Sequence, residues 1–195
     1  MSPIVLATRN AHKVREFERL LPGVAIAPLP DSAPTPEETG TTYAENALIK
    51  ARSAAQATGE PSFADDSGIE AEALDWRPGV HTARFAGPDA SDGENLAKLH
   101  REAPAGSRAR YVCVIAYVSA DGGEELFEGT CEGTLADQPA GGGGFGYDPL
   151  LVPVEFPDRT MAELTDEQKD AISHRGKAAR ALAAWLAAAL RFSTS

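Results

Sequence analysis

Two adjacent carboxylates, Asp65 and Asp66, follow a short apolar run and precede Ser67 and Gly68. The apolar run indicates a buried strand, and we expect the strand to present both acids at its carboxyl end. Open α/β sheets bind ligands at that edge. Because neighbouring carboxylates repel each other, the pair favours a bound hard cation with oxygen ligands. An ordinary polar turn is the alternative, since Asp-Ser-Gly is also common in turns.

A second candidate site precedes a helix near the start of the chain. Residues 4–7 are apolar and predict a short strand, and Asn10 can cap the helix that follows the polar turn. The N–H groups and dipole at the start of a helix attract anions, and Lys13 adds a full positive charge. A solvated lysine of the first helical turn is the alternative for Lys13. The helix should end at Pro22-Gly23.

The segment 28–40 contains four prolines and several acids and is predicted to be a loop. Thr42 and Glu45 form a capping box for the next helix, which should end at Gly59. Asn46 and Lys50 lie one turn apart on this helix. We expect the helix to pack on the sheet that contains the two acids.

The middle of the chain predicts further strands and a mixed sheet. Residues 69–73 alternate between apolar and acidic, and 110–120 are apolar on both faces, as in a central strand. The turn 121–123 should return the chain antiparallel. A capping box at Ser91 and Glu94 opens a helix between these strands, and 150–152 predict a further short strand.

A glycine-rich stretch, 140–149, holds one phenylalanine, Phe145, among five glycines. It lacks the Gly-Lys-Ser/Thr ending of a Walker-type phosphate loop. A sharply bent backbone that leaves a flat ring open to a ligand is one interpretation, and a flexible surface loop is the other. A helix is expected from about residue 160. Three donors, Lys169, His174 and Arg175, flank the junction with the last helix and suggest a binding site.

Composition restricts the class of protein. The chain has 195 residues, 43% of them hydrophobic, and a net charge of −11. The acidity argues against non-specific binding to nucleic acid or to an anionic membrane. Met1-Ser2-Pro3 leads directly into the first strand, and the apolar stretch 178–190 is too short to span a bilayer, so we expect a cytoplasmic protein. Cys113 and Cys131 are predicted to be buried thiols, although a hairpin could bring them together.

Taken together, the motifs resemble the inosine triphosphate pyrophosphatase family, in the family's order and over nearly the whole chain. Arg9 stands where many members have glycine, and an arginine there could also contact phosphates. The motifs are Thr8-Arg9-Asn10-Ala11-His12-Lys13, Tyr43-Ala44-Glu45-Asn46-Ala47, Ala64-Asp65-Asp66-Ser67-Gly68, Pro78-Gly79-Val80-His81-Thr82-Ala83-Arg84-Phe85, Gly144-Phe145-Gly146-Tyr147-Asp148-Pro149, and Lys169 with Ser173-His174-Arg175-Gly176.

The resemblance implies a single α/β domain over residues 1–195, with a long central mixed β-sheet flanked by helices. It also implies two lobes with the active site in the cleft between them, and a homodimer. The implied reaction is Mg²⁺-dependent hydrolysis of ITP, dITP and XTP to the monophosphate and pyrophosphate.

The site residues are carried over from the same resemblance. Asp66 would be the catalytic base and a metal ligand, with Glu37 as the second metal ligand and Glu38 as its alternative. Substrate would be bound by Thr8, Arg9, Asn10, Ala11, His12 and Lys13 at the phosphates, by Ser67, and by Phe145, Gly146, Tyr147, Asp148, Lys169, His174 and Arg175 at the base.

The chemistry of the donors agrees with a preference for keto purines. Hypoxanthine and xanthine carry a 6-keto oxygen that accepts from Lys169, His174 or Arg175, whereas adenine would place an amino donor against donors. Guanine also carries a 6-keto group, so its 2-amino group must be refused elsewhere. Two rival hypotheses are a Maf-type pyrophosphatase of other specificity and a catalytically idle nucleotide-binding protein.

Overall fold

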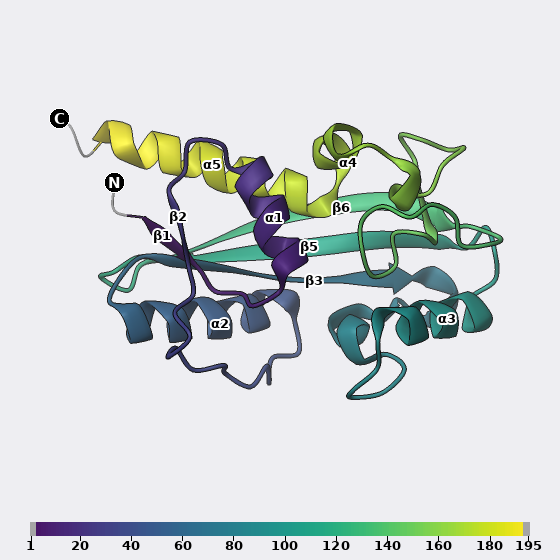
Figure 1. Cartoon of the computed structure of the whole chain (residues 1–195), viewed down its shortest axis with the longest axis horizontal. Coiled ribbons are helices and arrows are strands. Elements are labelled where there is room, and N and C mark those ends of the chain that lie inside the picture. Colours follow the sequence, from purple (N-terminus) through teal and green to yellow (C-terminus); the bar gives the residue numbers. More distant parts are fainter. Residues whose placement is uncertain (1–2, 193–195) are drawn as a thin grey trace. The chain divides into compact units, whose positions relative to one another are not determined.

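A computed structural model describes residues 3–192, with side chains to residue 189. Met1, Ser2 and the side chain of Leu190, on which parts of the localisation expectations rest, lie outside this range. The described strands form one mixed sheet of seven strands in the order β2-β1-β3-β5-β6-β7, with β4 paired to β3 (Figure 1). The pairing is parallel for β1 with β2 and β3, and antiparallel for β3 with β4 and β6 with β7. The predicted mixed α/β fold is confirmed.

The elements have the following bounds. The strands are β1 (Ile4–Leu6), β2 (Ile26–Pro28), β3 (Ser62–Ala71), β4 (Arg77–Pro78), β5 (Arg108–Val118), β6 (Glu124–Leu135) and β7 (Leu151–Pro153). The helices are α1 (Ala11–Leu20), α2 (Tyr43–Thr58), α3 (Asp92–Glu102), α4 (Asp166–Ile172) and α5 (His174–Phe192), with short 3₁₀ turns at Glu72–Leu74, Gly79–Arg84 and Met161–Glu163.

The chain divides into two compact units. Unit 1 comprises residues up to 66, then 113–128 and 175 onward, and unit 2 comprises 67–112 and 129–174. The three long strands β3, β5 and β6 each contribute residues to both units. In β3 the boundary falls between Asp66 and Ser67, so the two acids belong to unit 1.

Unit 1 has a helix layer on each face of its part of the sheet (Figure 1). On one face, α1 and α5 pack through Phe17 and Leu182 against Leu6 and Phe63. On the other face, the alanines of α2 pack against Ala64 and its neighbours on β1 and β5. Phe63 and Ala64 therefore point to opposite faces, as successive strand residues must. The small residues of α2 allow its backbone to lie close to the sheet.

Local signals set the helix ends where the sequence predicts them. The Asn10 side chain caps α1 by accepting from the backbone N–H groups of His12 and Lys13. Capping boxes open α2 at Thr42 and α3 at Ser91, and Gly59 closes α2 in the left-handed conformation. The expected helix from residue 160 is shorter than predicted, because a 3₁₀ turn that begins after Thr160 and a separate capping box at Thr165 precede α4.

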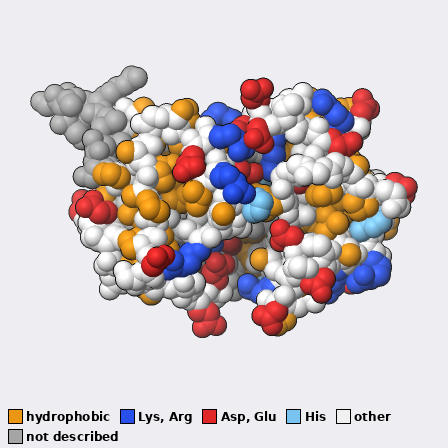
Figure 2. All heavy atoms as spheres, viewed as in Figure 1, with side chains coloured by type: hydrophobic (Ala, Val, Ile, Leu, Met, Phe, Trp, Pro, Cys, Tyr) orange, Lys and Arg blue, Asp and Glu red, His pale blue; other side chains and the backbone are white. Residues whose placement is uncertain are grey.

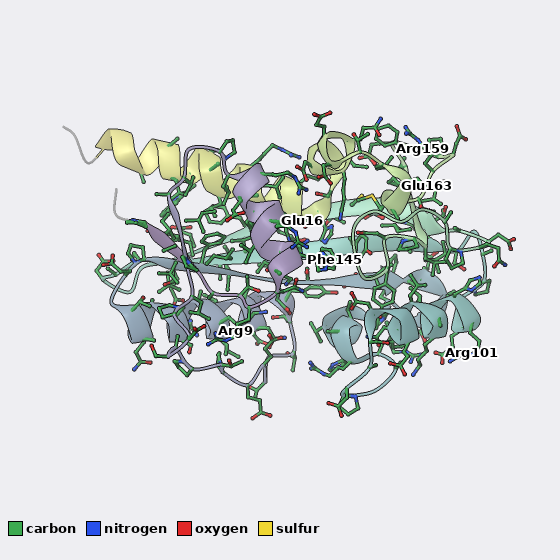
Figure 3. All side chains as sticks on the ribbon, viewed as in Figure 1. Arg9, Glu16, Arg101, Phe145, Arg159 and Glu163 are labelled. Carbon is green, nitrogen blue, oxygen red and sulfur yellow. The ribbon has the colours of Figure 1, made fainter. Side chains whose placement is uncertain are left out.

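Unit 2 has its own core, in which Ile69 and Tyr111 from the sheet pack with Leu99 of α3 and Leu150. The glycine-rich stretch forms the loop between β6 and β7, and Figure 3 shows Phe145 on it. Cys113 and Cys131 are buried on β5 and β6 and no disulfide joins them, as predicted. They belong to different units.

Charges of both signs are mixed on the face of the molecule shown in Figure 2. Figure 2 shows Lys and Arg side chains interspersed with Asp and Glu over the face it presents. In the part of the chain that the structure describes, no helix is long and apolar enough to cross a membrane.

Candidate active site

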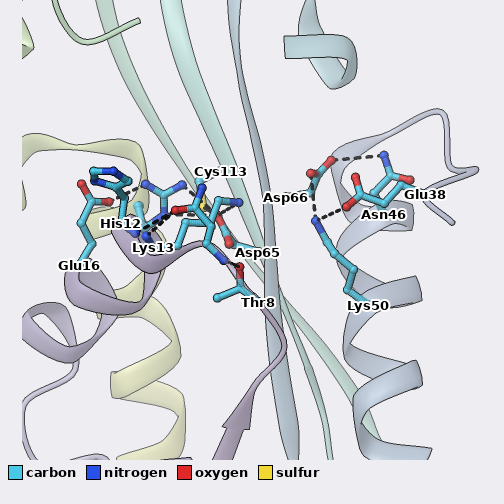
Figure 4. A network of polar contacts seen from close by, with 12 residues as sticks. Thr8, His12, Lys13, Glu16, Glu38, Asn46, Lys50, Asp65, Asp66 and Cys113 are labelled. Atoms are coloured by element: carbon cyan, nitrogen blue, oxygen red, sulfur yellow. Dashed lines mark hydrogen bonds and ion pairs between the residues drawn. The ribbon is translucent and has the colours of Figure 1, made fainter. Parts of the chain in front are cut away.

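The two adjacent acids lie in the middle of a strand. β3 continues through Ala71, so the expectations that the strand ends at Asp66, or turns there, are both wrong. Because side chains alternate along a strand, Asp65 points toward α1 and Asp66 toward α2 (Figure 4). Both are buried, with exposed fractions of 2% and 7%. The acids therefore do not share one cation. Each has a separate set of partners.

Asp65 is the centre of a buried ion network in unit 1. Its Oδ2 lies 2.9 Å from Lys13 Nζ and accepts from Arg175 at 3.0 and 3.3 Å. Arg175 also donates to Glu16 at 2.6 Å, and the Cys113 thiol lies 3.9 Å from Asp65. Burial alone would raise the pKa of Asp65, but the charges of Lys13 and Arg175 outweigh it and hold that pKa well below its usual range. Asp65 is thus a fixed anion that orients two cations.

The charge of the Asp66 carboxylate is compensated less completely than that of Asp65. Its Oδ1 lies 3.2 Å from Lys50 Nζ, and its Oδ2 accepts from the Asn46 amide at 3.3 Å. Lys50 is shared, because its ammonium also lies 3.1 Å from Glu38 Oε1. Burial raises the pKa of Asp66, and the attraction of Lys50 and Lys13 does not fully offset it. A carboxylate with a raised pKa is a stronger base than an ordinary aspartate.

The loop before α1 approaches β3 on the side of Asp65 (Figure 4). Thr8 Oγ1 accepts from the Asn10 N–H at 3.2 Å, which shapes the turn into the helix. Arg9 turns to the neighbouring loop, where it donates to the Ala33 carbonyl at 2.8 Å and to Thr35 at 3.4 Å (Figure 3). Residues 9–12 are exposed, and Lys13 and Thr8 are half-buried. The structure thus brings Thr8 and Lys13 to the Asp65 side of β3 (Figure 4).

Glu37 and Glu38, the two alternatives for the second metal ligand, differ in their position relative to Asp66. Glu38 is half-buried and reaches the Asp66 neighbourhood through Lys50, whereas Glu37 is exposed. Among the described residues, no group of three or more His, Cys, Asp or Glu side chains is assembled as a metal site. The carboxylate pair that the structure brings together is Asp66 and Glu38.

Unit 2 contains a separate cluster around Asp148. Its Oδ2 accepts from Lys169 Nζ and from the Phe145 N–H, both at 2.8 Å. The Lys169 ammonium lies 5.3 Å from the centre of the Phe145 ring. A side chain at Gly144 would collide with Asp148, because a Cβ there would overlap the Asp148 carboxylate. The loop is therefore shaped by Asp148 rather than being an unstructured glycine run.

Aromatic residues support this cluster. Tyr111 of β5 is hydrogen-bonded to Asp148 and stacks on His174, with ring centroids 4.5 Å apart and planes inclined by 16°. Burial and the nearby Asp148 raise the pKa of Tyr111 well above its usual value, so its hydroxyl stays protonated. Tyr147 is buried and donates to the Thr82 carbonyl at 2.8 Å, which anchors the loop.

The structure groups the expected base-binding residues only in part. Phe145, Asp148, Lys169 and His174 lie together in unit 2, and Gly146 donates to Asp92 at 3.2 Å. Arg175 instead directs its guanidinium to the carboxylates of unit 1. Ser67 is half-buried on β3, next to Asp66 in the chain.

Several partners of the expected residues were not assigned a role from the sequence. Four of them are Lys50, Asn46, Glu16 and Tyr111. One signal was available, because Asn46 and Lys50 lie one turn apart on a helix expected to approach Asp66. No spacing signal points to Glu16 or Tyr111, since their partners are distant in the chain.

Comparison with known proteins decides the family. A model of the Ham1 family matches residues 4–185. The chain belongs to the Ham1 family. A relative from Symbiobacterium thermophilum, named dITP/XTP pyrophosphatase, is 52% identical over 180 residues, which is 90% of each chain. A second protein of that name, from Cutibacterium acnes, is 48% identical over 93% of this chain and 95% of its own.

A solved Ham1 structure supports the same assignment. The HAM1 protein from Coxiella burnetii superposes with a TM-score of 0.83 at 41% identity, covering 96% of this chain and 99% of its own. The Ham1 fold is thus an α/β fold with a central mixed sheet, as observed.

Proposed function

We propose that this protein hydrolyses non-standard purine nucleoside triphosphates to the monophosphate and pyrophosphate. dITP and XTP are the first candidates, because the similar Ham1 relatives are named dITP/XTP pyrophosphatases. The structural observation that carries the proposal is the difference between the two adjacent aspartates of β3. Asp65 is a fixed anion that holds Lys13, and Asp66 is a buried carboxylate with a raised pKa.

Asp66 is assigned as the general base. A carboxylate accepts a proton from an attacking water more readily as its pKa approaches the working pH. Burial raises the pKa of Asp66 and so moves it toward the working pH. Attack at the α-phosphorus then releases pyrophosphate, whose developing charge must be stabilised. Lys13 and the N–H groups at the start of α1 supply positive charge for that purpose.

Mg²⁺ fits the carboxylates of this site. Asp66 and Glu38 share one ammonium through oxygen atoms, and carboxylate oxygens are the ligands that Mg²⁺ prefers. Mg²⁺ sites in phosphoryl-transfer enzymes use one or two carboxylates together with substrate phosphates, so a third acidic ligand is not required. We therefore assign Glu38, in place of Glu37, as the second ligand. When bound, the ion would neutralise phosphate charge.

The purine base is assigned to the Asp148 cluster of unit 2. The Phe145 ring can stack on any base. Lys169 and His174 remain the proposed donors to the 6-keto oxygen, with Ser67, Gly146 and Tyr147 as further substrate contacts, whereas the guanidinium of Arg175 is held by Asp65 and Glu16. Asp148 holds Lys169 in place at 2.8 Å. Adenine would present an amino donor to these donors, and a buried mismatch of this kind is costly.

A substrate panel tests the function. dITP, XTP, ITP, dGTP, ATP and dTTP are assayed separately for pyrophosphate and orthophosphate, with Mg²⁺ and with EDTA. We expect pyrophosphate from the first three, loss of activity with EDTA, and recovery on adding Mg²⁺. Faster hydrolysis of a pyrimidine or standard nucleotide would favour the Maf-type alternative. Binding without hydrolysis would favour an idle nucleotide-binding protein.

Removing Lys169 and removing Lys13 should have different effects. Lys169→Ala is expected to lower kcat/KM for XTP by at least about tenfold while changing that for ATP much less, because the lost donor contacts only a keto base. Lys13→Ala should lower kcat/KM for all triphosphates by a similar factor, because it removes a phosphate contact. The kcat/KM ratio of XTP to ATP measures the difference. An unchanged ratio in Lys169→Ala would place base recognition elsewhere.

We also propose that the enzyme is a cytoplasmic homodimer, as the family resemblance implies. Light scattering coupled to size-exclusion chromatography measures its mass directly. A mass of one chain, 20.5 kDa, would contradict the dimer.

A further inference from the structure

Lys50 occupies the position between the two carboxylates assigned to metal binding. Its ammonium lies 3.2 Å from Asp66 Oδ1 and 3.1 Å from Glu38 Oε1, and its side chain is 16% exposed (Figure 4). The other oxygen of Asp66 is occupied by the Asn46 amide. The Lys50 ammonium therefore pairs with both carboxylates and compensates part of their charge.

An ammonium and a divalent cation compete for such oxygens. Both are attracted to Asp66 and Glu38, and like charges only a few ångströms apart repel each other strongly where burial limits screening by water. A divalent ion bound by both carboxylates would thus displace the ammonium from at least one of them. Lysine suits this exchange, because its charge sits on a flexible four-carbon stem. The stem itself is anchored on α2, whose two ends are capped.

We propose that Lys50 is a resident counterion, which a divalent metal must displace from Asp66 and Glu38 in order to bind. The inference rests on the proposed function, which supplies the metal. The exchange has two consequences. The charge of the carboxylates is partly compensated when no metal is present, and the metal alone binds weakly because it must displace an existing ion pair.

A simple structural role for Lys50 makes the opposite prediction. If the ammonium only joins α2 to the loop that carries Glu38, its removal should loosen the carboxylates and leave Mg²⁺ affinity unchanged or lower. If it is a counterion that must be displaced, its removal should raise the affinity for Mg²⁺. The direction of the change in Mg²⁺ affinity therefore distinguishes the structural role of Lys50 from the counterion role.

The experiment is calorimetric titration of the full-length protein with Mg²⁺ alone, in the absence of nucleotide. Lys50→Met removes the charge and keeps a similar stem, and Lys50→Gln is the second variant should Met impair folding. Lys98→Met is the control, because Lys98 is a partly exposed lysine of α3 that pairs with Glu102 in unit 2. We expect the Kd for Mg²⁺ to fall at least tenfold in the Lys50 variants and to stay unchanged in Lys98→Met.

Three results would overturn the exchange: an unchanged Kd in the Lys50 variants, a higher Kd, or no detectable Mg²⁺ binding by any variant. Each leaves the proposed function to its own test, since pyrophosphate release from XTP by the wild-type protein is measured independently. Conversely, tighter Mg²⁺ binding with no hydrolysis of any nucleotide would support the exchange and refute the enzyme.

Discussion

Asp66→Asn is expected to lower kcat for XTP hydrolysis by about a thousandfold, because asparagine cannot accept the proton of the attacking water. The same change should leave the free energy of unfolding unchanged or higher. Burial raises the pKa of Asp66, so its ionised form is disfavoured in the folded protein. Pyrophosphate release measures the first effect, and urea denaturation followed by circular dichroism measures the second.

The effect of Asp66→Asn on the free energy of unfolding should depend on pH. The pKa of Asp66 is higher in the folded protein than in the unfolded chain, where it is about 3.9. The folded wild type therefore binds the proton more tightly and loses stability as the pH rises above that value. The advantage of Asp66→Asn over the wild type should appear as the pH is raised from about 4 to 7. Near wild-type hydrolysis by the variant would remove Asp66 from the role of base.

Asp65→Asn, one residue away, is expected to destabilise the protein by about 3–5 kcal/mol, the usual cost of removing one partner from a buried ion pair. The amide leaves Arg175, which is 2% exposed, with Glu16 as its remaining carboxylate partner among the contacts described above. It also releases Lys13, so KM for triphosphates should rise. Urea denaturation at neutral pH measures the loss, and Asp66→Asn is the matched control on the same strand.

The sign of the pH dependence is opposite for Asp65. Its pKa is held below the ordinary value in the folded protein. Its contribution to stability is thus fully present above the unfolded pKa of about 3.9 and is lost as the pH falls below it. The stability difference between wild type and Asp65→Asn should shrink as the pH is lowered from 5 toward 2. Glu16→Gln keeps the Asp65 pair and should cost less, about 1.5–3 kcal/mol. Equal stability of Asp65→Asn and wild type at pH 7 would contradict the buried network.

The two neighbouring aspartates of β3 have different roles, one in the stability of the fold and the other in the proposed reaction. Asp65 pairs with two cations through Oδ2 and stabilises the fold, whereas the charge of Asp66 is incompletely compensated and its carboxylate is available for chemistry. Perturbed carboxylates of the second kind cluster at functional sites. The counterion role of Lys50 explains how such a group is tolerated when no metal is bound.

Local features of this protein were determined by the sequence itself. The capping residues Asn10, Thr42 and Ser91 and the terminator Gly59 act over a few residues, so the ends of their helices follow from spacing alone. The apolar run of β5 likewise indicates a central strand, because both faces of such a strand are buried. The order of motifs was enough to indicate the family.

Only the tertiary structure decided which side chains meet. Arg175 and Asp65 are 110 positions apart, and Lys169 and Asp148 are 21 apart, so no local rule pairs them. β3 runs past the two acids to Ala71, where Glu70 and Ala71 pair with β4. Strand alternation then sends Asp65 and Asp66 to opposite faces. Glu38 rather than Glu37 shares Lys50 with Asp66. The sequence could not decide between the two acids, because a proline-rich loop has no period from which the direction of a side chain could be predicted.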